Sequence, residues 1–177
     1  IKIKKTKKYD FINIRKPKKI NAFNYQIPGD ISSSAFFIVL TMLTNNSKLL
    51  IKDVNINPSR TGVITILKKM GAKISLKNKK SYRCEKISDI MIQSSKNLKG
   101  INCPSELNSC AIDEFLIIFL AAAKARGTSY FKNISELNQK ESPRLIWGSK
   151  ILNMMGIKTD LTKDSIKIYG QPNLEIK

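Results

Sequence analysis

The stretch "IDEFLIIFLAAAKARGTSYFKNI" (residues 112–134) decides the fold class, because it places a helix pattern directly before a strand pattern. The run "FLIIFLAAA" (115–123) is apolar on nearly every side, which predicts a buried helix rather than a surface helix. The short alternating run "TSYFKNI" (128–134) indicates a strand. A buried helix followed by a strand predicts an α/β fold in which helices lie beneath sheets.

The same order of elements occurs earlier in the chain, so the sequence contains an internal repeat. Residues 32–76 and 112–161 both contain an apolar helix, a strand, a second helix ending in Met-Gly, and another strand. "IKDV" (51–54) matches "FKNI" (131–134), and "KKMGAKI" (68–74) matches "NMMGIKT" (153–159). The second segment has about five extra residues between its strand and its second helix. A repeat of this length lies outside the range of short solenoids.

Two glycines mark where the second helix of each segment ends. Apolar residues recur near the helical period before each of them: Val63, Leu67 and Met70 before Gly71, and Leu145, Leu152 and Met155 before Gly156, with Gly148 on the same face. Glycine at this place favours a left-handed helix cap. "SSSAFFIVLTML" (32–43) is also apolar on nearly all sides and predicts a second fully buried helix.

The first 27 residues do not follow the repeat. They are basic and strand-like, and the turn residues Pro28, Gly29 and Asp30 follow them. We therefore expect residues 1–27 to be the tail of a preceding domain. Residues 28–177 would form a second domain of two units, at about 30–100 (the first unit) and 101–170 (the second unit). Since the chain begins with isoleucine, we expect it to be a piece of a longer protein.

Composition limits the function classes. The net charge is +19, which favours anionic partners. However, only five of the 32 basic residues are arginine, and the lysines are spread along a chain rich in isoleucine and asparagine, as in a biased background composition. No zinc-finger, RNP-like or basic heptad pattern is present, so we expect no specific nucleic-acid partner. No apolar run is long enough to span a bilayer, and we expect no membrane partner.

The chain has three cysteines and no histidine. A zinc or redox centre is therefore not expected, and we predict no metal and no cofactor. Reduced thiols in the cytoplasm are the default for such a chain. Without histidine, acid–base chemistry must come from carboxylates, lysine or tyrosine.

Asp113 lies where the apolar helix 115–123 begins. A carboxylate there has two interpretations. It caps free backbone N–H groups at the positive end of the helix dipole, or it points into a cleft and accepts a proton. The residues alone leave both open.

A second candidate cluster is "KESPR" (140–144). Serine is a preferred N-cap and proline is favoured at the first helical position, so Ser142 is predicted to cap a helix that Pro143 opens. Arg144 then lies in the first turn, and Lys140 and Glu141 lie in the preceding loop. A cation in a first turn opposes the helix dipole, so this arrangement suits a bound carboxylate or phosphate. The alternative is a solvated helix start.

At these residues the chain resembles the 5-enolpyruvylshikimate-3-phosphate synthase family. The motifs are "PGDISSSAFF" (28–37), "NPSRTG" (57–62), "AIDEFLIIFLAAAKARGTS" (111–129) and "ELNQKESPR" (136–144), and the similarity extends over nearly all of residues 26–170. The resemblance implies an enolpyruvyl transferase-like fold of repeated βαβαββ units, with the active site between two domains. This chain would hold the end of the first domain and two of the three units of the second.

The resemblance also implies a reaction and roles for residues. The 5-hydroxyl of shikimate 3-phosphate attacks phosphoenolpyruvate, C3 is protonated, and the tetrahedral intermediate loses phosphate. Asp113 is similar to the family's base that contacts the shikimate hydroxyl, and Glu141 looks like the proton-transfer residue. Lys140 would contact both substrates, and Arg144 would hold the phosphoenolpyruvate carboxylate.

The chain departs from the family at several places. Asn138, Gln139 and Pro143 replace Arg, Val and Asp of the usual Arg-Val-Lys-Glu-Ser-Asp-Arg pattern. The family's N-terminal phosphate-binding segment and its Asp-His-Arg helix are not in this sequence. We therefore expect the chain to be inactive alone and to need the remainder of a longer enzyme. The alternatives are an enolpyruvyl transferase acting on UDP-N-acetylglucosamine, and a non-catalytic basic module that binds anions or nucleic acid.

Overall fold

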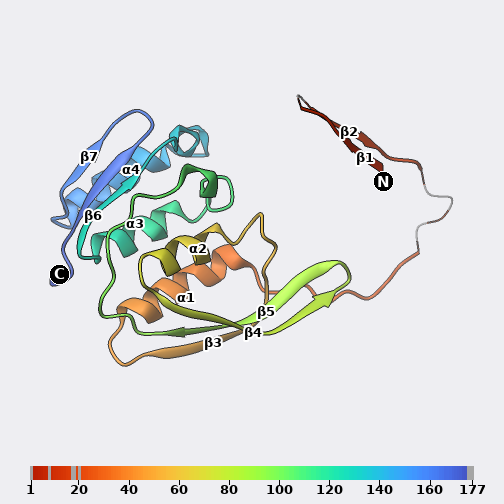
Figure 1. Ribbon diagram of the computed structural model, residues 1–177, viewed down its shortest axis with the longest axis horizontal. Coiled ribbons are helices and arrows are strands. Elements are labelled where there is room, and N and C mark those ends of the chain that lie inside the picture. Colours follow the sequence, from red (N-terminus) through yellow and green to blue (C-terminus); the bar gives the residue numbers. More distant parts are fainter. Residues whose placement is uncertain (1, 8, 17–18, 20, 175–177) are drawn as a thin grey trace.

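The computed structural model describes residues 2–7, 9–16, 19 and 21–174. In these residues the chain forms two three-stranded sheets, each with helices packed against it, and a separate two-stranded hairpin of β1 (Lys2–Lys5) and β2 (Asp10–Asn13). Figure 1 shows the hairpin apart from the rest of the molecule, at the end of an extended segment. The predicted α/β class, with helices under sheets, is confirmed.

The first unit follows the predicted order. It contains α1 (Ile31–Leu43), β3 (Lys48–Asn55), α2 (Gly62–Lys69), β4 (Lys73–Tyr82) and β5 (Glu85–Gln93). Its sheet has the order β3-β5-β4, with both pairs antiparallel. Gly29 forms a parallel bridge with Val54, so residues 28–30 run beside β3 rather than forming the predicted turn. The unit therefore begins with a single-residue strand.

The second unit has the same order of elements. It contains α3 (Phe115–Ala123), β6 (Gly127–Phe131), α4 (Arg144–Met154), β7 (Thr159–Leu161) and β8 (Ile166–Gly170), with short 3-10 helices η1 (Ser105–Leu107) and η2 (Ser135–Gln139). The sheet order is β6-β8-β7, again antiparallel. Lys99 and Asn102 form parallel bridges with β6 or the residue before it, as Gly29 does with β3. The two units thus share one βαβαββ arrangement.

The two Met-Gly sequences end their helices in the same way. Gly71 has φ 97° and Gly156 has φ 80°. After α2, the Gly71 N–H donates to Lys68 O and the Ala72 N–H to Leu67 O. After α4, the Gly156 and Ile157 N–H groups make the equivalent pair of bonds. These are Schellman caps, which need a left-handed residue and so favour glycine.

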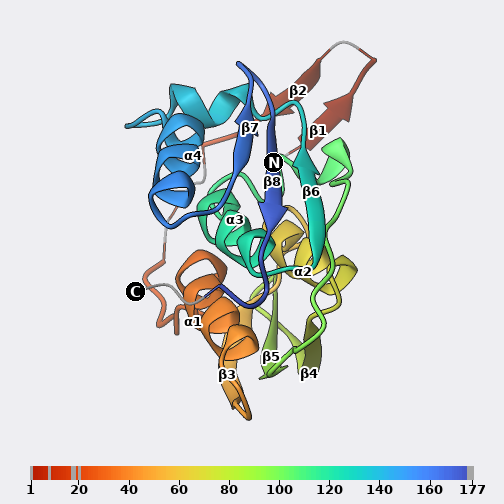
Figure 2. The same ribbon diagram turned by 90° about the vertical axis from the view of Figure 1, so that its left-hand side faces the viewer.

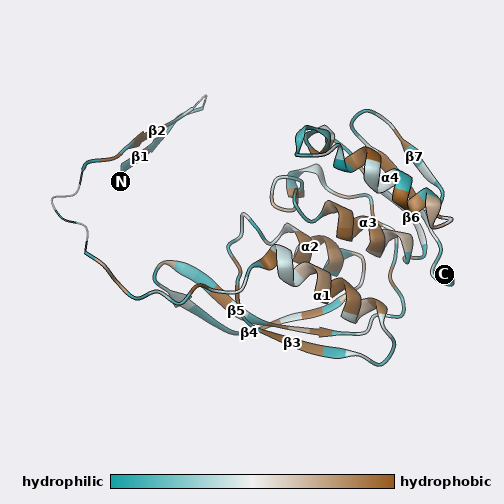
Figure 3. Ribbon diagram, turned by 180° about the vertical axis from the view of Figure 1, so that it is seen from behind, coloured by the Kyte–Doolittle hydropathy of each residue, from teal (hydrophilic) through white to brown (hydrophobic). Residues whose placement is uncertain are grey.

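The core lies where the helices of both units meet. α3 packs against α1, α2 and α4 and against its own strand β8, and Figure 2 shows it between α1 and α4. Its Phe115 and Phe119 meet Phe131 of β6, with ring centroids 5.3 to 5.8 Å apart. Figure 3 shows the apolar character of α1, α2 and α3. Within the described residues, no helix is long and apolar enough to cross a membrane.

The prediction that the first apolar helix is buried on nearly all sides is wrong. In α1, Phe36, Phe37 and Leu40 are 61%, 58% and 63% exposed. The reason is that α1 packs on β3 and β5 on one side and on α3 on another, which leaves one stripe uncovered. In α4, Trp147, Ile151 and Met154 are also exposed. We call these six side chains the open apolar residues.

The two units meet through a close backbone contact at Gly62, the first residue of α2. Its N–H donates to the carbonyl of Cys110, just before α3, at 3.0 Å. A Cβ at this position would lie 2.7 Å from the Cys110 carbonyl carbon and oxygen. Only glycine therefore allows this approach.

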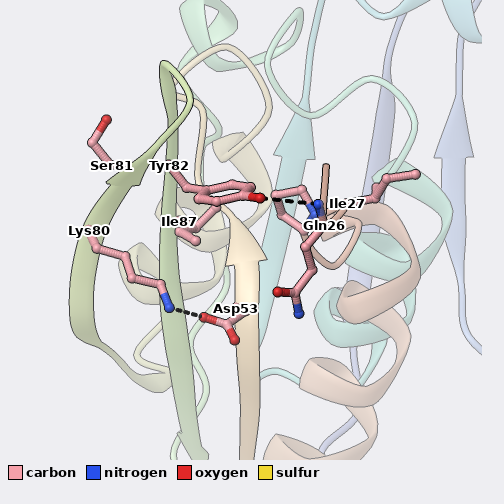
Figure 4. Close-up of a pocket in the computed structure, with 8 residues that line it drawn as sticks. Gln26, Ile27, Asp53, Lys80, Ser81, Tyr82 and Ile87 are labelled. Carbon is pink, nitrogen blue, oxygen red and sulfur yellow. Dashed lines mark hydrogen bonds and ion pairs between the residues drawn. The ribbon is translucent and has the colours of Figure 1, made fainter. Parts of the chain in front are cut away.

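The segment before Gly29 rests on the tip of the β4–β5 hairpin. The Gln26 N–H donates to the Tyr82 hydroxyl at 3.2 Å, and the rings of Tyr25 and Tyr82 lie 5.2 Å apart. Figure 4 shows Gln26 beside Tyr82, with Lys80 paired to Asp53 next to them. A cavity of about 190 Å³ lies between the segment and the hairpin.

Paired irregularities bend the sheet below this hairpin. β3 has a register shift at Asp53 and β4 has one at Asn78, and both residues have left-handed backbones with φ near 50°. Asp89 of the central strand accepts hydrogen bonds from the Asp53 N–H and the Asn78 amide. The first bond satisfies the backbone donor of the bulged Asp53, and the second links the Asn78 side chain to the central strand.

Candidate functional site

Asp113 lies immediately before α3, and cations from a distant loop converge on its carboxylate. The Lys140 Nζ is 3.3 Å from Asp113 Oδ1, and the Arg144 Nη1 is 3.5 Å from the same oxygen. Both cationic side chains are about three-quarters buried. The structure therefore brings together Asp113, Lys140 and Arg144, which the sequence analysis named as candidate site residues.

Glu141 contacts Arg144 rather than Asp113. Its Oε2 is 2.7 Å from Arg144 Nη2, and its side chain is 80% exposed. Its own backbone N–H, and then the Arg144 guanidinium, lower the pKa of the Glu141 carboxyl. Glu141 is thus an ionised group at the outer side of the cluster.

The start of α4 differs from the prediction. The helix begins at Arg144, Pro143 occupies the N-cap position, and no side chain of the N-cap makes a capping bond. Ser142 is therefore not the cap, and Pro143 is not the first helical residue. Instead, the Asn138 amide oxygen accepts the Ile146 N–H at 3.3 Å. A distant amide supplies a bond that proline, which has no suitable side chain, cannot make.

The interpretation of Asp113 as the cap of α3 is also wrong. The N-cap is Glu114, and it makes no side-chain cap bond. The Glu114 carboxyl is only 3% exposed and accepts a hydrogen bond from the Ser32 hydroxyl. Burial raises the pKa of Glu114, and the Ser32 bond partly opposes this. The Asp113 carboxylate is thus left to the cations around it.

Arg60 is a member of the cluster that the sequence analysis gave no role. Its Nη2 lies 3.9 Å from Asp113 Oδ2 and donates to Ser32 Oγ at 2.9 Å. The internal repeat could have indicated Arg60 from the sequence. Arg60 lies in the loop before α2, the loop that corresponds to the one carrying Lys140 and Glu141 before α4.

The cluster has the chemistry of an anion site with an acid–base group inside it. Arg60, Lys140 and Arg144 place three positive charges around the single carboxylate of Asp113. The charged donors suit a carboxylate or a phosphate, and they would repel a metal cation. A ligand that combines an anionic group with a hydroxyl could use both parts of the site.

Comparison with protein families shows which family the chain belongs to. The family model for EPSP synthase (3-phosphoshikimate 1-carboxyvinyltransferase) matches residues 1–176. This chain belongs to the EPSP synthase family.

Individual relatives agree with this assignment. The 3-phosphoshikimate 1-carboxyvinyltransferase of Ruthia magnifica subsp. Calyptogena magnifica is 46% identical over 152 residues, which cover 86% of this chain and 35% of that protein. The same-named protein of Legionella pneumophila (strain Paris) is 46% identical over 146 residues, 81% of this chain and 33% of that one. The chain thus spans about a third of the length of the EPSP synthases it matches.

A solved structure supports the fold. The EPSP synthase of Acinetobacter baumannii superposes with a TM-score of 0.80 at 44% sequence identity, over 82% of this chain and 33% of that chain. These relatives carry the shikimate name, so they give no support to the alternative that acts on UDP-N-acetylglucosamine.

Proposed function

We propose that this chain supplies part of the active site of an enzyme that transfers the enolpyruvyl group of phosphoenolpyruvate to the 5-hydroxyl of shikimate 3-phosphate, releasing phosphate. The reaction belongs to the shikimate pathway of aromatic amino acid biosynthesis. The observation that carries the proposal is the convergence of Lys140 and Arg144 on Asp113 in a member of the EPSP synthase family.

Lys140 and Arg144 hold phosphoenolpyruvate in this proposal. Arg144 forms a fork with its carboxylate that lysine could not reproduce. Lys140 also reaches shikimate 3-phosphate. Before the substrates bind, both cations face Asp113, so this carboxylate holds the place of the anion.

Asp113 and Glu141 carry the proton transfers. Asp113 accepts the proton of the 5-hydroxyl as its oxygen attacks C2 of phosphoenolpyruvate, and C3 gains a proton. Once phosphoenolpyruvate has drawn Arg144 away, the pKa of the Glu141 carboxyl rises toward its ordinary value, so this group can take up a proton and give it to C3. As a carboxylate, Glu141 then takes a proton back from the methyl group of the intermediate. Loss of that proton and of phosphate from the tetrahedral intermediate gives the enolpyruvyl ether.

We infer that other segments of the full-length enzyme complete the site. Residues 1–27 would end one domain, and residues 28–177 would form two units of the next. The open apolar residues of α1 and α4 support this inference, since exposed aromatic stripes on packed helices mark a surface that another element covers. The three free thiols support a cytoplasmic location.

Titration of the purified chain with phosphoenolpyruvate, shikimate 3-phosphate and a DNA duplex tests the proposal. We expect both small ligands to bind, and Arg144→Ala to weaken phosphoenolpyruvate binding at least tenfold, because it removes a charge-assisted bond. Salt-dependent DNA binding that Arg144→Ala does not change would instead support the non-catalytic basic module. Phosphate release by the chain alone would contradict the inference that it holds half a site.

A further inference from the structure

The Asp113 carboxylate is contacted at its two oxygens by cations from different units. Lys140 and Arg144, both of the second unit, face Oδ1. Arg60, of the first unit, faces Oδ2 at 3.9 Å. The orientation of this carboxylate therefore depends on both units.

Two hydrogen bonds in series, through Ser32 to Glu114, hold the Arg60 side chain in place. Its Nη2 donates to the Ser32 hydroxyl at 2.9 Å, and that hydroxyl donates to Glu114. Ser32 lies in the first turn of α1, and Glu114 is the N-cap residue of α3. Glu114 is almost fully buried, so this chain of bonds, which we call the Glu114 tether, is anchored in the packed helices.

Lys140 and Arg144 are held differently. The further acidic partner of Arg144 is Glu141, whose side chain is 80% exposed, and the contact of Lys140 is with Asp113 itself. Both cations lie on the loop and helix start at residues 140–144. An incoming anion can draw them from Oδ1, while the Glu114 tether keeps Arg60 at Oδ2.

We propose that Arg60 is a positioning residue, held by Ser32 and Glu114, that orients Asp113 so that Oδ1 faces the substrate hydroxyl. The inference rests on the proposed function, in which Asp113 accepts the proton of the 5-hydroxyl of shikimate 3-phosphate. It adds that the first unit controls a group carried by the second. Arg60 acts through Asp113 and does not itself hold phosphoenolpyruvate.

Calorimetric titration of the 177-residue chain with each substrate separately distinguishes the role of Arg60 from that of Arg144. We expect Arg60→Gln to weaken shikimate 3-phosphate binding about tenfold, because it removes the cation that faces Asp113 Oδ2, and to leave phosphoenolpyruvate binding unchanged. Arg144→Gln should do the reverse. Arg60→Lys should restore part of the loss. Arg126→Gln is the matched control, since this exposed arginine lines a separate cavity.

Two further variants test the route of the effect. Ser32→Ala cuts the tether without changing a charge, and we expect it to weaken shikimate 3-phosphate binding several-fold in a chain that melts as wild type does. In an Asp113→Asn background, Arg60→Gln should cause no additional loss, because it acts through the missing carboxylate.

Three results separate the claims. An unchanged shikimate 3-phosphate affinity in Arg60→Gln would overturn the inference and leave the proposed function standing. A full tenfold loss in the Asp113→Asn background, or an equal loss for phosphoenolpyruvate, would make Arg60 a direct ligand of the substrate and overturn its positioning role. A wild-type chain that binds neither ligand would overturn the proposed function, and the inference with it.

Discussion

The two units share one order of elements and differ in the connection between their first long strand and their second helix. In the first unit this connection covers residues 56–61, and in the second it covers residues 132–143 and includes η2. The short loop contributes Arg60, and the long loop contributes Lys140 and Glu141. A common scaffold thus places both loops beside Asp113, and the longer loop contributes two charged groups where the shorter loop contributes one.

The cores of the units differ as well, and the largest expected effect tests this difference. Phe131 is fully buried against two other phenylalanines, Phe115 and Phe119, whereas its repeat counterpart Ile51 is only partly buried. We expect Phe131→Ala to lower the free energy of unfolding by about 3–5 kcal/mol, because it leaves a large cavity. Ile51→Ala should cost roughly 1–2 kcal/mol. Urea unfolding measures both, and equal losses would show that the units have equivalent cores.

A substitution at the backbone contact between the two units should change the free energy of unfolding by a smaller amount. At Gly62, an added methyl group would meet the Cys110 backbone at 2.7 Å, so Gly62→Ala should cost about 1–3 kcal/mol. Gly148 of α4 is the control, because its added methyl would meet only the Leu116 and Phe119 side chains at 3.0 Å. Alanine favours a helix by up to about 1 kcal/mol over glycine, which offsets part of the crowding against these side chains, so Gly148→Ala should cost less than Gly62→Ala. If thermal melts rank the two variants in the opposite order, the backbone contact is not what joins the units.

The smallest effect concerns the carboxyl groups of the two N-cap residues, Asp30 of α1 and Glu114 of α3. Their pKa values shift in opposite directions. The Ser33 N–H lowers the pKa of Asp30, and burial raises the pKa of Glu114. Asp30 therefore adds stability above its ordinary pKa of 3.8, which is lost as the pH falls through the folded value. The contribution of Glu114 is present below 4.5 and is lost as the pH rises through its folded value.

Variants in which an amide replaces each carboxyl reveal these opposite dependences of stability on pH. From pH 3 to 7, the stability of wild type relative to Asp30→Asn should rise with pH, by about 0.5–1 kcal/mol in total, as for a typical cap. Relative to Glu114→Gln it should fall. Unfolding curves at several pH values measure both differences, and parallel slopes would show that the two caps are in similar environments.

Sequence patterns predicted the parts of the structure that depend on local chemistry. The Met-Gly pairs end α2 and α4 because a left-handed cap needs glycine. The motif around residue 140 marked Lys140 and Arg144 as candidate site residues, and the structure shows that both lie close to Asp113. Arg60 was missed because its contact with Asp113 joins residues far apart in the chain. The start of α4 was misplaced because the capping group, Asn138, lies outside the local Ser-Pro signal. The exposure of Phe36 depends on what packs against α1, which a hydrophobicity pattern does not contain.

The hairpin that supports residues 25–26 has a mechanical consequence. Its tip contacts the segment leading to β1 and β2 through Tyr82, and its base contains the bulges at Asp53 and Asn78. The Asp89 carboxylate accepts a hydrogen bond from each of the two bulges and so links them. Because Tyr82 contacts residues 25 and 26, the bend at these bulges also sets where the segment just before Gly29 lies. The Asp53 backbone N–H and the side chains of Asn78 and Asp89 therefore help to fix the direction in which this segment enters the first unit.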